Sequence, residues 1–232
     1  GAANVNQGVI KYATNDARTF KVTAYDLRLS IDAHLPYQWV NTATDYDADP
    51  AKFPAYLSFD GVDDALQTTN IDFTGTDKMT VWAGVTKLSD AVAGIVVELS
   101  ASQAGNNGSF YLAAPVSAVP NVGFLARGTV NTSLPAADAT WAAPASLVAT
   151  GQGLIGGATP NILRTTGKPE RTAANSIGTG NYGNYPLYIG ARAGTTHYFN
   201  GRIYSLIVRG AQTNLSQIEA AERYIKQKMR LP

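Results

Sequence analysis

The sequence contains no cysteine and little charge. Without cysteine, the 232-residue chain can form neither a disulfide nor a metal site with thiolate ligands. Charged residues make up 15% of the chain, against about 25% in an average globular protein, and the net charge is +1. Nucleic-acid-binding domains usually show a basic patch or stripe, whereas the basic residues here are scattered until the C-terminal segment. We therefore expect no nucleic-acid partner.

Long apolar runs are also missing. The longest uncharged stretch, residues 99–126, is interrupted by glycines, asparagines and prolines. A membrane-spanning helix needs roughly 20 continuous apolar residues, which this stretch does not supply. We expect no membrane insertion.

Strong helix formers are scarce outside the C-terminus, whereas glycine (22 residues) and tyrosine (12 residues) are frequent. This profile is typical of many short strands joined by turns. No linker divides the chain, so we predict a single domain over residues 1–232, with an irregular part at 1–54 that contains one opening strand. The predicted strands cover residues 26–33, 55–59, 65–68, 79–87, 94–100, 109–113, 121–127, 146–150, 162–165, 187–191 and 201–209.

Two segments support more detailed predictions. In residues 79–87, Met79, Val81 and Val85 alternate with Trp82 and other side chains, which is the period of two of a strand, and we expect Trp82 to be buried. The glycine-rich segment 151–157 lacks the Lys-Ser/Thr of a phosphate-binding loop and does not open a helix. It is predicted to form a turn or a bulge.

One helix is expected, over residues 215–230. Ser216 followed by Glu219 is the pattern of a capping box. Apolar residues recur at helical spacing and should cover an edge or an end of a sheet. Glutamates four residues before basic residues, Glu219–Arg223 and Glu222–Lys226, favour ion pairs along the helix. The apolar stripe consists of Ile218, Ala221, Ile225 and Met229.

Four segments in order resemble laminin G-like, concanavalin A-like jelly rolls. They are the turn Phe59–Asp64, the strand Leu187–Arg192, the last strand Phe199–Val208 and the helix start Leu215–Glu219. Thr165-Thr166-Gly167 departs from the Val-Asn-Gly that this family tends to carry, but it keeps the turn glycine. The resemblance implies an all-β fold, a two-sheet antiparallel jelly-roll sandwich with one C-terminal α-helix.

Two further segments, Asp77–Val81 and Val96–Ser100, make the chain similar to jelly-roll domains of tailed-phage and prophage virion proteins. That resemblance implies a non-enzymatic module on the surface of a virion, in its tail or capsid. Its partners would be host-surface carbohydrate or other virion proteins, and the parent assembly could make it a homo-oligomer. The alternatives are a purely structural assembly domain and a glycan-degrading enzyme.

Catalytic residues are hard to find. Sandwich glucanases of this superfamily carry Glu-x-Asp-x-x-Glu on one strand, whereas Glu98 stands alone in its strand and is predicted to face solvent. No Gly-x-Ser-x-Gly elbow accompanies the two histidines, His34 and His197, which read as turn residues. We therefore expect no catalytic residue and no cofactor.

A calcium site is conceivable at the turn after Phe59. Asp60, Asp63 and Asp64 offer the oxygen ligands that calcium prefers. The alternative is that these side chains accept backbone N–H groups and stabilise the turn without a metal. Asp45, Asp47 and Asp49 form a second acidic cluster.

Glycan binding is the remaining functional hypothesis. Sugars stack on exposed aromatic rings and bond to amide, carboxylate and basic groups, and residues of these types gather in loops late in the chain. The alternative is that the aromatic rings pack on the sandwich with satisfied hydroxyls. The candidate glycan-binding residues are Tyr182, Tyr185, Arg192, His197, Tyr198 and Trp141, with Trp39, Asn181 and Asn184 as further possibilities.

Overall fold

The computed structural model describes residues 55–231, except 103, 104, 106, 131–134 and 174. From Tyr56 onward the chain forms one compact unit. The predicted opening strand at 26–33, His34, Trp39 and the Asp45–Asp49 cluster lie outside the described residues. The single domain over 1–232 stays a prediction.

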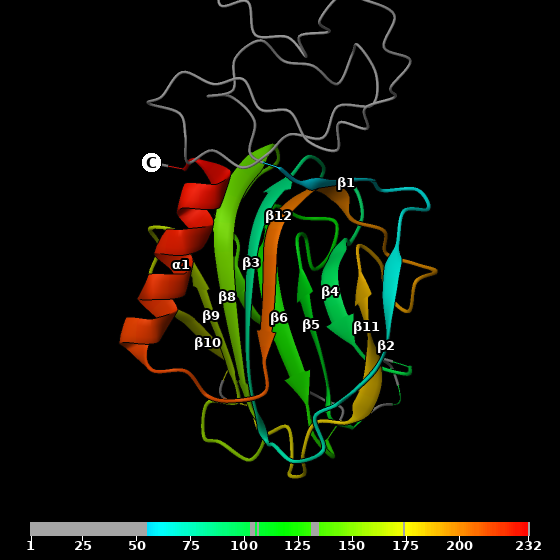
Figure 1. Cartoon of the computed structure of the whole chain (residues 1–232), viewed down its shortest axis with the longest axis vertical. Coiled ribbons are helices and arrows are strands. Elements are labelled where there is room, and N and C mark those ends of the chain that lie inside the picture. The colour runs from blue at the N-terminus through cyan, green and yellow to red at the C-terminus, as the bar shows by residue number, and fades with distance from the viewer. Residues whose placement is uncertain (1–54, 103–104, 106, 131–134, 174, 232) are drawn as a thin grey trace, which may run out of the picture. The chain divides into compact units, whose positions relative to one another are not determined.

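In the described part of the chain, twelve strands form two antiparallel sheets of six. Figure 1 shows how these strands are arranged. In spatial order, the first sheet consists of β1 (Leu57–Asp60), β12 (Asn200–Arg209), β3 (Lys78–Lys87), β8 (Ala145–Leu154), β9 (Asn161–Thr165) and β10 (Arg171–Ala173). The second sheet consists of β2 (Leu66–Asp72), β11 (Asn184–Ile189), β4 (Ile95–Leu99), β5 (Ser109–Ala113), β6 (Val122–Arg127) and β7 (Ala136–Asp138).

Every strand predicted between residues 55 and 209 is present, within a few residues of its expected ends. The three-residue strands β7 and β10 were not predicted because both carry too few residues for a pattern; β7 directly follows Pro135, and β10 begins two residues after Pro169. The main core lies between the sheets, where Val81 and Val85 of β3 pack with residues such as Leu99 and Phe124 of the second sheet. The alternation predicted for β3 is therefore confirmed.

Helix α1 (Leu215–Met229) covers the opposite face of the first sheet, where it contacts β3, β8 and β12. Figure 1 shows it along one side of the sandwich. Ile218, Ile225 and Met229 of the predicted stripe are buried against Trp82 and Val148. The helix thus covers the middle of a sheet and not an edge or end, because β3 has to bury both of its faces. Among the described residues, no helix is long and apolar enough to cross a membrane.

The predicted capping box is wrong. Asn214 caps the helix, and its Oδ1 accepts the backbone N–H of Gln217 at 3.0 Å. Ser216 donates its hydroxyl proton to the same oxygen at 2.9 Å. Glu222, predicted to pair with Lys226, instead accepts from Thr150 at 2.8 Å and from the Arg164 Nε at 3.2 Å. It therefore ties the helix to β8 and β9.

The glycine-rich segment 151–157 was also predicted wrongly in part. Gly151 and Gly153 belong to strand β8, whose turn begins only after Leu154. A Cβ at Gly151 would lie 2.1 Å from the Phe124 ring, and one at Gly153 would lie 2.0 Å from the Tyr182 hydroxyl oxygen. These glycines make room for aromatic rings in the core, which sequence spacing alone does not reveal.

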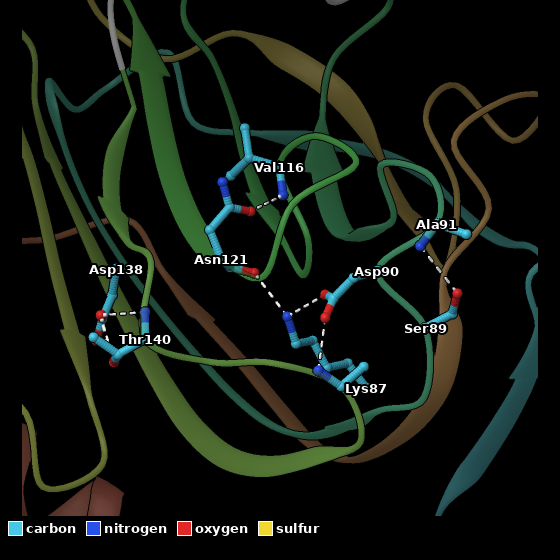
Figure 2. A network of polar contacts seen from close by, with 9 residues as sticks. Lys87, Ser89, Asp90, Ala91, Val116, Asn121, Asp138 and Thr140 are labelled. Carbon is cyan, nitrogen blue, oxygen red and sulfur yellow. Dashed lines mark hydrogen bonds and ion pairs between the residues drawn. The ribbon is translucent and has the colours of Figure 1, made fainter.

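A buried lysine anchors the loops at one end of the sandwich (Figure 2). The Lys87 ammonium has no exposed surface, pairs with Asp90 and donates to the Asn121 carbonyl oxygen at 3.1 Å. The Asn121 side chain accepts the backbone N–H of Val116 at 2.8 Å. Val116 in turn packs on the outer face of the second sheet, over Gly123. The network therefore holds the 114–121 loop over part of that face.

Replacing Lys87 should destabilise the folded protein because the Asp90 carboxylate would lose its counter-charge. We expect Lys87→Met to lower the free energy of unfolding by about 3–5 kcal/mol, as breaking a buried pair does. Lys78→Met is the matched control, since the Lys78–Asp77 pair is exposed, and it should cost less than about 1 kcal/mol. Urea unfolding measures both. Equal effects of the two substitutions would contradict the structural role of Lys87.

Candidate functional site

The outer face of the second sheet carries a row of polar and aromatic side chains. Tyr188 of β11 pairs with Glu98 of β4, and Glu98 pairs with Tyr111 of β5. The neighbours of Glu98 along its strand, Val97 and Leu99, belong to the core between the sheets, so Glu98 points to the other side. We call Tyr188, Glu98 and Tyr111 the outer row.

Glu98 does not face solvent, contrary to the prediction from its strand position. Its side chain has no exposed surface, and it accepts the Ser100 hydroxyl proton at 2.5 Å and the Arg192 Nε–H at 3.2 Å. The prediction missed this because Arg192 is far away in sequence and reaches Glu98 only through the pairing of β4 with β11. A carboxylate buried this way needs both partners to offset its lost hydration.

Arg192 lies in the loop between β11 and β12, which is held in place by backbone bonds. Phe199 donates to the Gly190 carbonyl at 2.8 Å, Ile95 donates to the His197 carbonyl at 2.9 Å, and Arg192 and Thr196 form a β-bridge. The fixed loop sets the guanidinium over the Tyr111 ring, 5.2 Å from its centroid. About a quarter (25%) of the Arg192 side chain stays exposed. The row thus presents a charged, hydrogen-bonding group held by an aromatic ring and a carboxylate.

A second guanidinium belongs to the same face. Arg127 ends β6 opposite Ser109, two residues from Leu125, which is the outer-face neighbour of Tyr111. Burial lowers the pKa of Arg127; Tyr111 and Glu98 act against this shift, and Arg192 adds to it. Burial also raises the pKa of Tyr111, against the effect of the two guanidiniums. These four side chains therefore form one electrostatic unit.

The predicted glycan-binding residues fall into three separate places. Arg192, His197 and Tyr198 share the 190–199 loop, where His197 is exposed and Tyr198 half-buried. Tyr185 lies near the other end of β11, where its hydroxyl donates to the Asn107 carbonyl at 3.1 Å and its ring packs on the main core. Trp141 packs on the core and donates from Nε1 to Asp138 at 3.1 Å.

Tyr182 has to be withdrawn as a candidate. Its side chain is 1% exposed and lies in the core, in edge contact with Phe110 and above the space left by Gly153. No face of its ring is open to a sugar. Asn181 donates to the Thr74 carbonyl at 2.6 Å, while Asn184 lies in β11. Spacing in a Tyr-Gly-Asn-rich segment could not distinguish an exposed loop tyrosine from one that enters the core.

The sequence reasoning missed Tyr111, Tyr188 and Arg127 and dismissed Glu98. One signal was available, namely a glutamate within the apolar run Ile95–Leu99. A charged side chain in such a strand must point away from the core and find a partner. The identity of that partner depended on the strand order.

Asp60, Asp63 and Asp64 do converge. Each offers one carboxylate oxygen, and these oxygens lie within 4.8 Å of one another on an exposed turn. Asp60 Oδ1 accepts the backbone N–H of Val62 at 2.7 Å, and Asp64 accepts that of Asp60 at 3.0 Å. The turn therefore has the hydrogen bonds that stabilise it without a metal, and calcium binding stays a prediction.

Comparison with known proteins bears on the fold. The sequence matches no known family model and no curated protein. The structure is similar to the heptameric SAP-like pentraxin of Limulus polyphemus, with a TM-score of 0.54 and 13% identity over 71% of this chain and 80% of that one. At such identity the likeness concerns the fold alone. Together with the two antiparallel sheets, it confirms the predicted jelly-roll sandwich.

Two weaker similarities have TM-scores below 0.5. The Ruminococcus gnavus IT-sialidase CBM40 has a TM-score of 0.47 and 14% identity over 68% of this chain and 98% of that one. Domains LG4-5 of the mouse laminin alpha1 chain have a TM-score of 0.49 and 14% identity over 68% of this chain and 41% of that one.

The pKa of His197 responds to the charge of Arg192 on the outer face of the second sheet. Burial, and secondly the charge of Arg192, lower the pKa of His197 because both disfavour the imidazolium. We expect an NMR titration midpoint below about 6.5, and Arg192→Gln should raise it. The His197 pKa is therefore higher in the unfolded chain than in the folded one, and the unfolded chain takes up the proton at a higher pH. As the pH falls below about 6.5, this difference should lower the free energy of unfolding. The chain has two histidines, so the variant His34→Gln assigns the two imidazole signals. An unchanged His197 midpoint in Arg192→Gln would contradict the effect of the Arg192 charge on His197.

Proposed function

We propose that this chain is a non-enzymatic carbohydrate-binding module whose ligand lies on the outer row beside Arg192. The observation that supports this most strongly is the Glu98–Arg192 pair on the outer face of a sheet. A sandwich buries apolar side chains between its sheets and has no structural need for a buried ion pair on its outside. Burying such a pair is costly, and its stabilising effect is often small or negative.

The chemistry of the row suits a sugar. Binding sites for small molecules combine apolar and aromatic surface with a few fixed polar groups. Tyr111 and Tyr188 are buried (7% and 9% exposed), so they line the site from beneath and offer little open ring surface. The exposed quarter (25%) of the Arg192 side chain belongs to a guanidinium, which carries several N–H donors in one plane. Glu98 and the ring of Tyr111 hold that plane, so little side-chain entropy is lost when a ligand binds.

The arrangement favours binding over hydrolysis. A retaining glycosidase needs two carboxylates about 5 Å apart, one of them protonated to act as an acid. Glu98 is held by Arg192 and Ser100, and in the described part of the chain no acidic residue neighbours it across the strands, where Tyr188 and Tyr111 stand. Glycan degradation is therefore the less favoured alternative.

As a finer proposal, the module belongs to the surface of a tailed-phage particle and binds host-surface carbohydrate or a neighbouring virion protein. This rests on the sequence resemblance of Asp77–Val81 and Val96–Ser100 to virion domains. Mass spectrometry of purified particles from the source strain should then detect the chain. Its presence only in cell fractions without particles would contradict the proposal.

A structural assembly domain is the second candidate, supported by the sheet edges. Among the described residues β1 and β2 are edge strands, and their residues Leu57 and Leu66 are about half exposed (49% and 48%). A sheet edge of this kind can pair with another chain. This role predicts a symmetric oligomer in solution without sugar affinity. Glycan binding by a monomer would favour the first candidate.

The glycan-binding proposal is tested by applying the full chain to an array of bacterial surface polysaccharides. Arg192→Gln should weaken binding about tenfold or more, because a charge-assisted hydrogen bond contributes about 1.5–3 kcal/mol. Arg171→Gln is the matched control, since Arg171 lies exposed on the edge strand β10 of the other sheet, and it should bind like the wild type.

Removing Arg192 leaves Glu98 buried without its counter-charge, so loss of binding could reflect misfolding. The double variant Glu98→Gln/Arg192→Gln keeps a neutral hydrogen-bonding pair, and thermal unfolding should confirm that it folds. Unchanged sugar binding by this folded double variant would refute the outer row as the site. Failure of the wild type to bind any glycan on the array would refute the function.

A further inference from the structure

We propose that a cavity at the other end of β11 from Arg192 is a second ligand site, which binds a neutral, hydroxyl-rich saccharide of about disaccharide size. Asn181, which lines the cavity, precedes β11, whereas Arg192 follows it. The six residues of β11 span roughly 16 Å at about 3.3 Å per residue, so the two sites are separate. The inference goes beyond the proposed function, because it concerns other residues at another end of the sandwich.

Three segments that are far apart in the sequence form the cavity. Residues 77–78 lead into β3, residues 154–157 make the turn after β8, and residues 179–181 precede β11. The cavity has a volume of about 470 Å³. Pockets that bind small molecules measure about 300–1,000 Å³, so its size suits a ligand of one or two sugar rings.

Hydrogen bonds between the segments fix the walls of the cavity. Ile155 donates its backbone N–H to the Asp77 carbonyl at 2.9 Å, which ties the β8 turn to the start of β3. The Asn181 side chain donates from Nδ2 to the Thr74 carbonyl at 2.6 Å, which ties the third segment to the same stretch. A ligand therefore meets walls that are already in place, and little ordering of loops opposes its binding.

Two glycines leave open space along these walls. Gly156 and Gly180 have φ angles of +83° and +106°, a region that glycine adopts readily. A Cβ built at either position would meet nothing within 4 Å. A ligand can therefore approach the backbone closely at both positions, where peptide N–H and C=O groups are within reach of its hydroxyls.

The charges that line the cavity cancel. Lys78 donates from Nζ to Asp77 Oδ1 at 2.8 Å, and the two side chains are 44% and 42% exposed. This bond is also the largest cause that lowers the pKa of Asp77, so the carboxylate is ionised at neutral pH. A charged ligand would have to compete with this pair for one of its members, whereas a neutral polar ligand can bond to both.

The polar groups offer donors and acceptors together. The Lys78 ammonium has three N–H donors and the Asp77 carboxylate is an acceptor only, so both keep capacity beyond their mutual bond. Since Nδ2 of Asn181 bonds to a carbonyl oxygen, its Oδ1 is the atom that can accept from a ligand. Thr179 adds a hydroxyl that can do either. A sugar presents several hydroxyls, each able to donate and to accept, and so matches this mixture.

The expected affinity is low. Among the described residues that line the cavity, none is aromatic, so binding would rest on hydrogen bonds and on contact with Leu154. Such bonds exchange with water and contribute little each, and we expect a dissociation constant of about 1 mM. The turns themselves require only the glycines, and they do not account for a carboxylate, an ammonium, a hydroxyl and an amide around one space.

Amide NMR of the full chain tests the site residue by residue. The probes are maltose, cellobiose, lactose and N,N′-diacetylchitobiose, each titrated to about 20 mM, well above a millimolar dissociation constant. We expect at least one of them to shift the signals of Gly156, Thr179 and Gly180 with a common midpoint. Digalacturonate, a charged disaccharide, should shift them less at the same concentration. Constant signals with all four neutral probes, or a larger effect of digalacturonate, would overturn the proposal.

The same spectra separate this site from the outer row, because the amides of Tyr111 and Arg192 report on the latter. If only the cavity signals move, the second site stands and the outer row loses its support. If only the outer-row signals move, the proposed function stands and the second site is wrong.

Variants assign the binding to the cavity. Thr179→Val keeps the shape of the side chain and should weaken binding about two- to tenfold, the effect of one neutral hydrogen bond. The double variant Asp77→Ala/Lys78→Met removes both charges and should weaken it about tenfold or more, because charge-assisted bonds are stronger. Thr172→Val, on the exposed edge strand β10, is the matched control and should bind like the wild type. Equal affinities of Thr179→Val, the double variant and this control would refute the site.

Discussion

Strand β3 must be buried on both faces, and much of the architecture follows from this constraint. One face packs into the core between the sheets, where Val81 and Val85 lie, and the other carries Trp82 beneath α1. Gly84 leaves the space that the helix occupies, since a Cβ there would lie 2.4 Å from Ile225 and 2.6 Å from Met229. The C-terminal helix is therefore part of the fold and closes the outer side of the first sheet.

In the part of the chain that the structure describes, no helix covers the second sheet, and the outer face of this sheet is divided. One part is apolar and is covered by the 114–121 loop, which the buried Lys87 network holds in place (Figure 2). The other part holds Glu98 and the guanidiniums, and Tyr111 belongs to both parts because it packs in the apolar cluster and lies beneath Arg192. Two of the ion pairs described above, Lys87–Asp90 and Glu98–Arg192, have different consequences for the surface. Lys87–Asp90 balances its own charge and anchors loops, whereas Glu98–Arg192 leaves Arg192 partly exposed beside a second arginine. This difference makes the second pair the better candidate for a binding site.

The errors of the sequence-based predictions have physical causes. Ser216 fits a capping box by spacing, yet Asn214 is the cap, because the helix begins at Leu215, two residues earlier than a cap at Ser216 would allow. Gly151 and Gly153 look like turn residues, although they lie in β8 opposite aromatic rings. Tyr182 was grouped with exposed loop tyrosines, although it fills the space that Gly153 leaves in the core. For Gly151, Gly153 and Tyr182, a partner distant in sequence decided the outcome.

The sequence by itself determined the class of fold, because period-two alternation, turn residues and one helical stripe depend on neighbours within a few positions of the chain. It also gave Arg192 and His197 as candidate binding residues, and both lie in the loop that borders the candidate site. Only the tertiary structure decided that Glu98 is buried, that Arg192 covers it and that Tyr111 and Arg127 share their face. Those contacts join β4, β5, β6 and the loop after β11, and the order of strands across a sheet is set by packing over the whole domain.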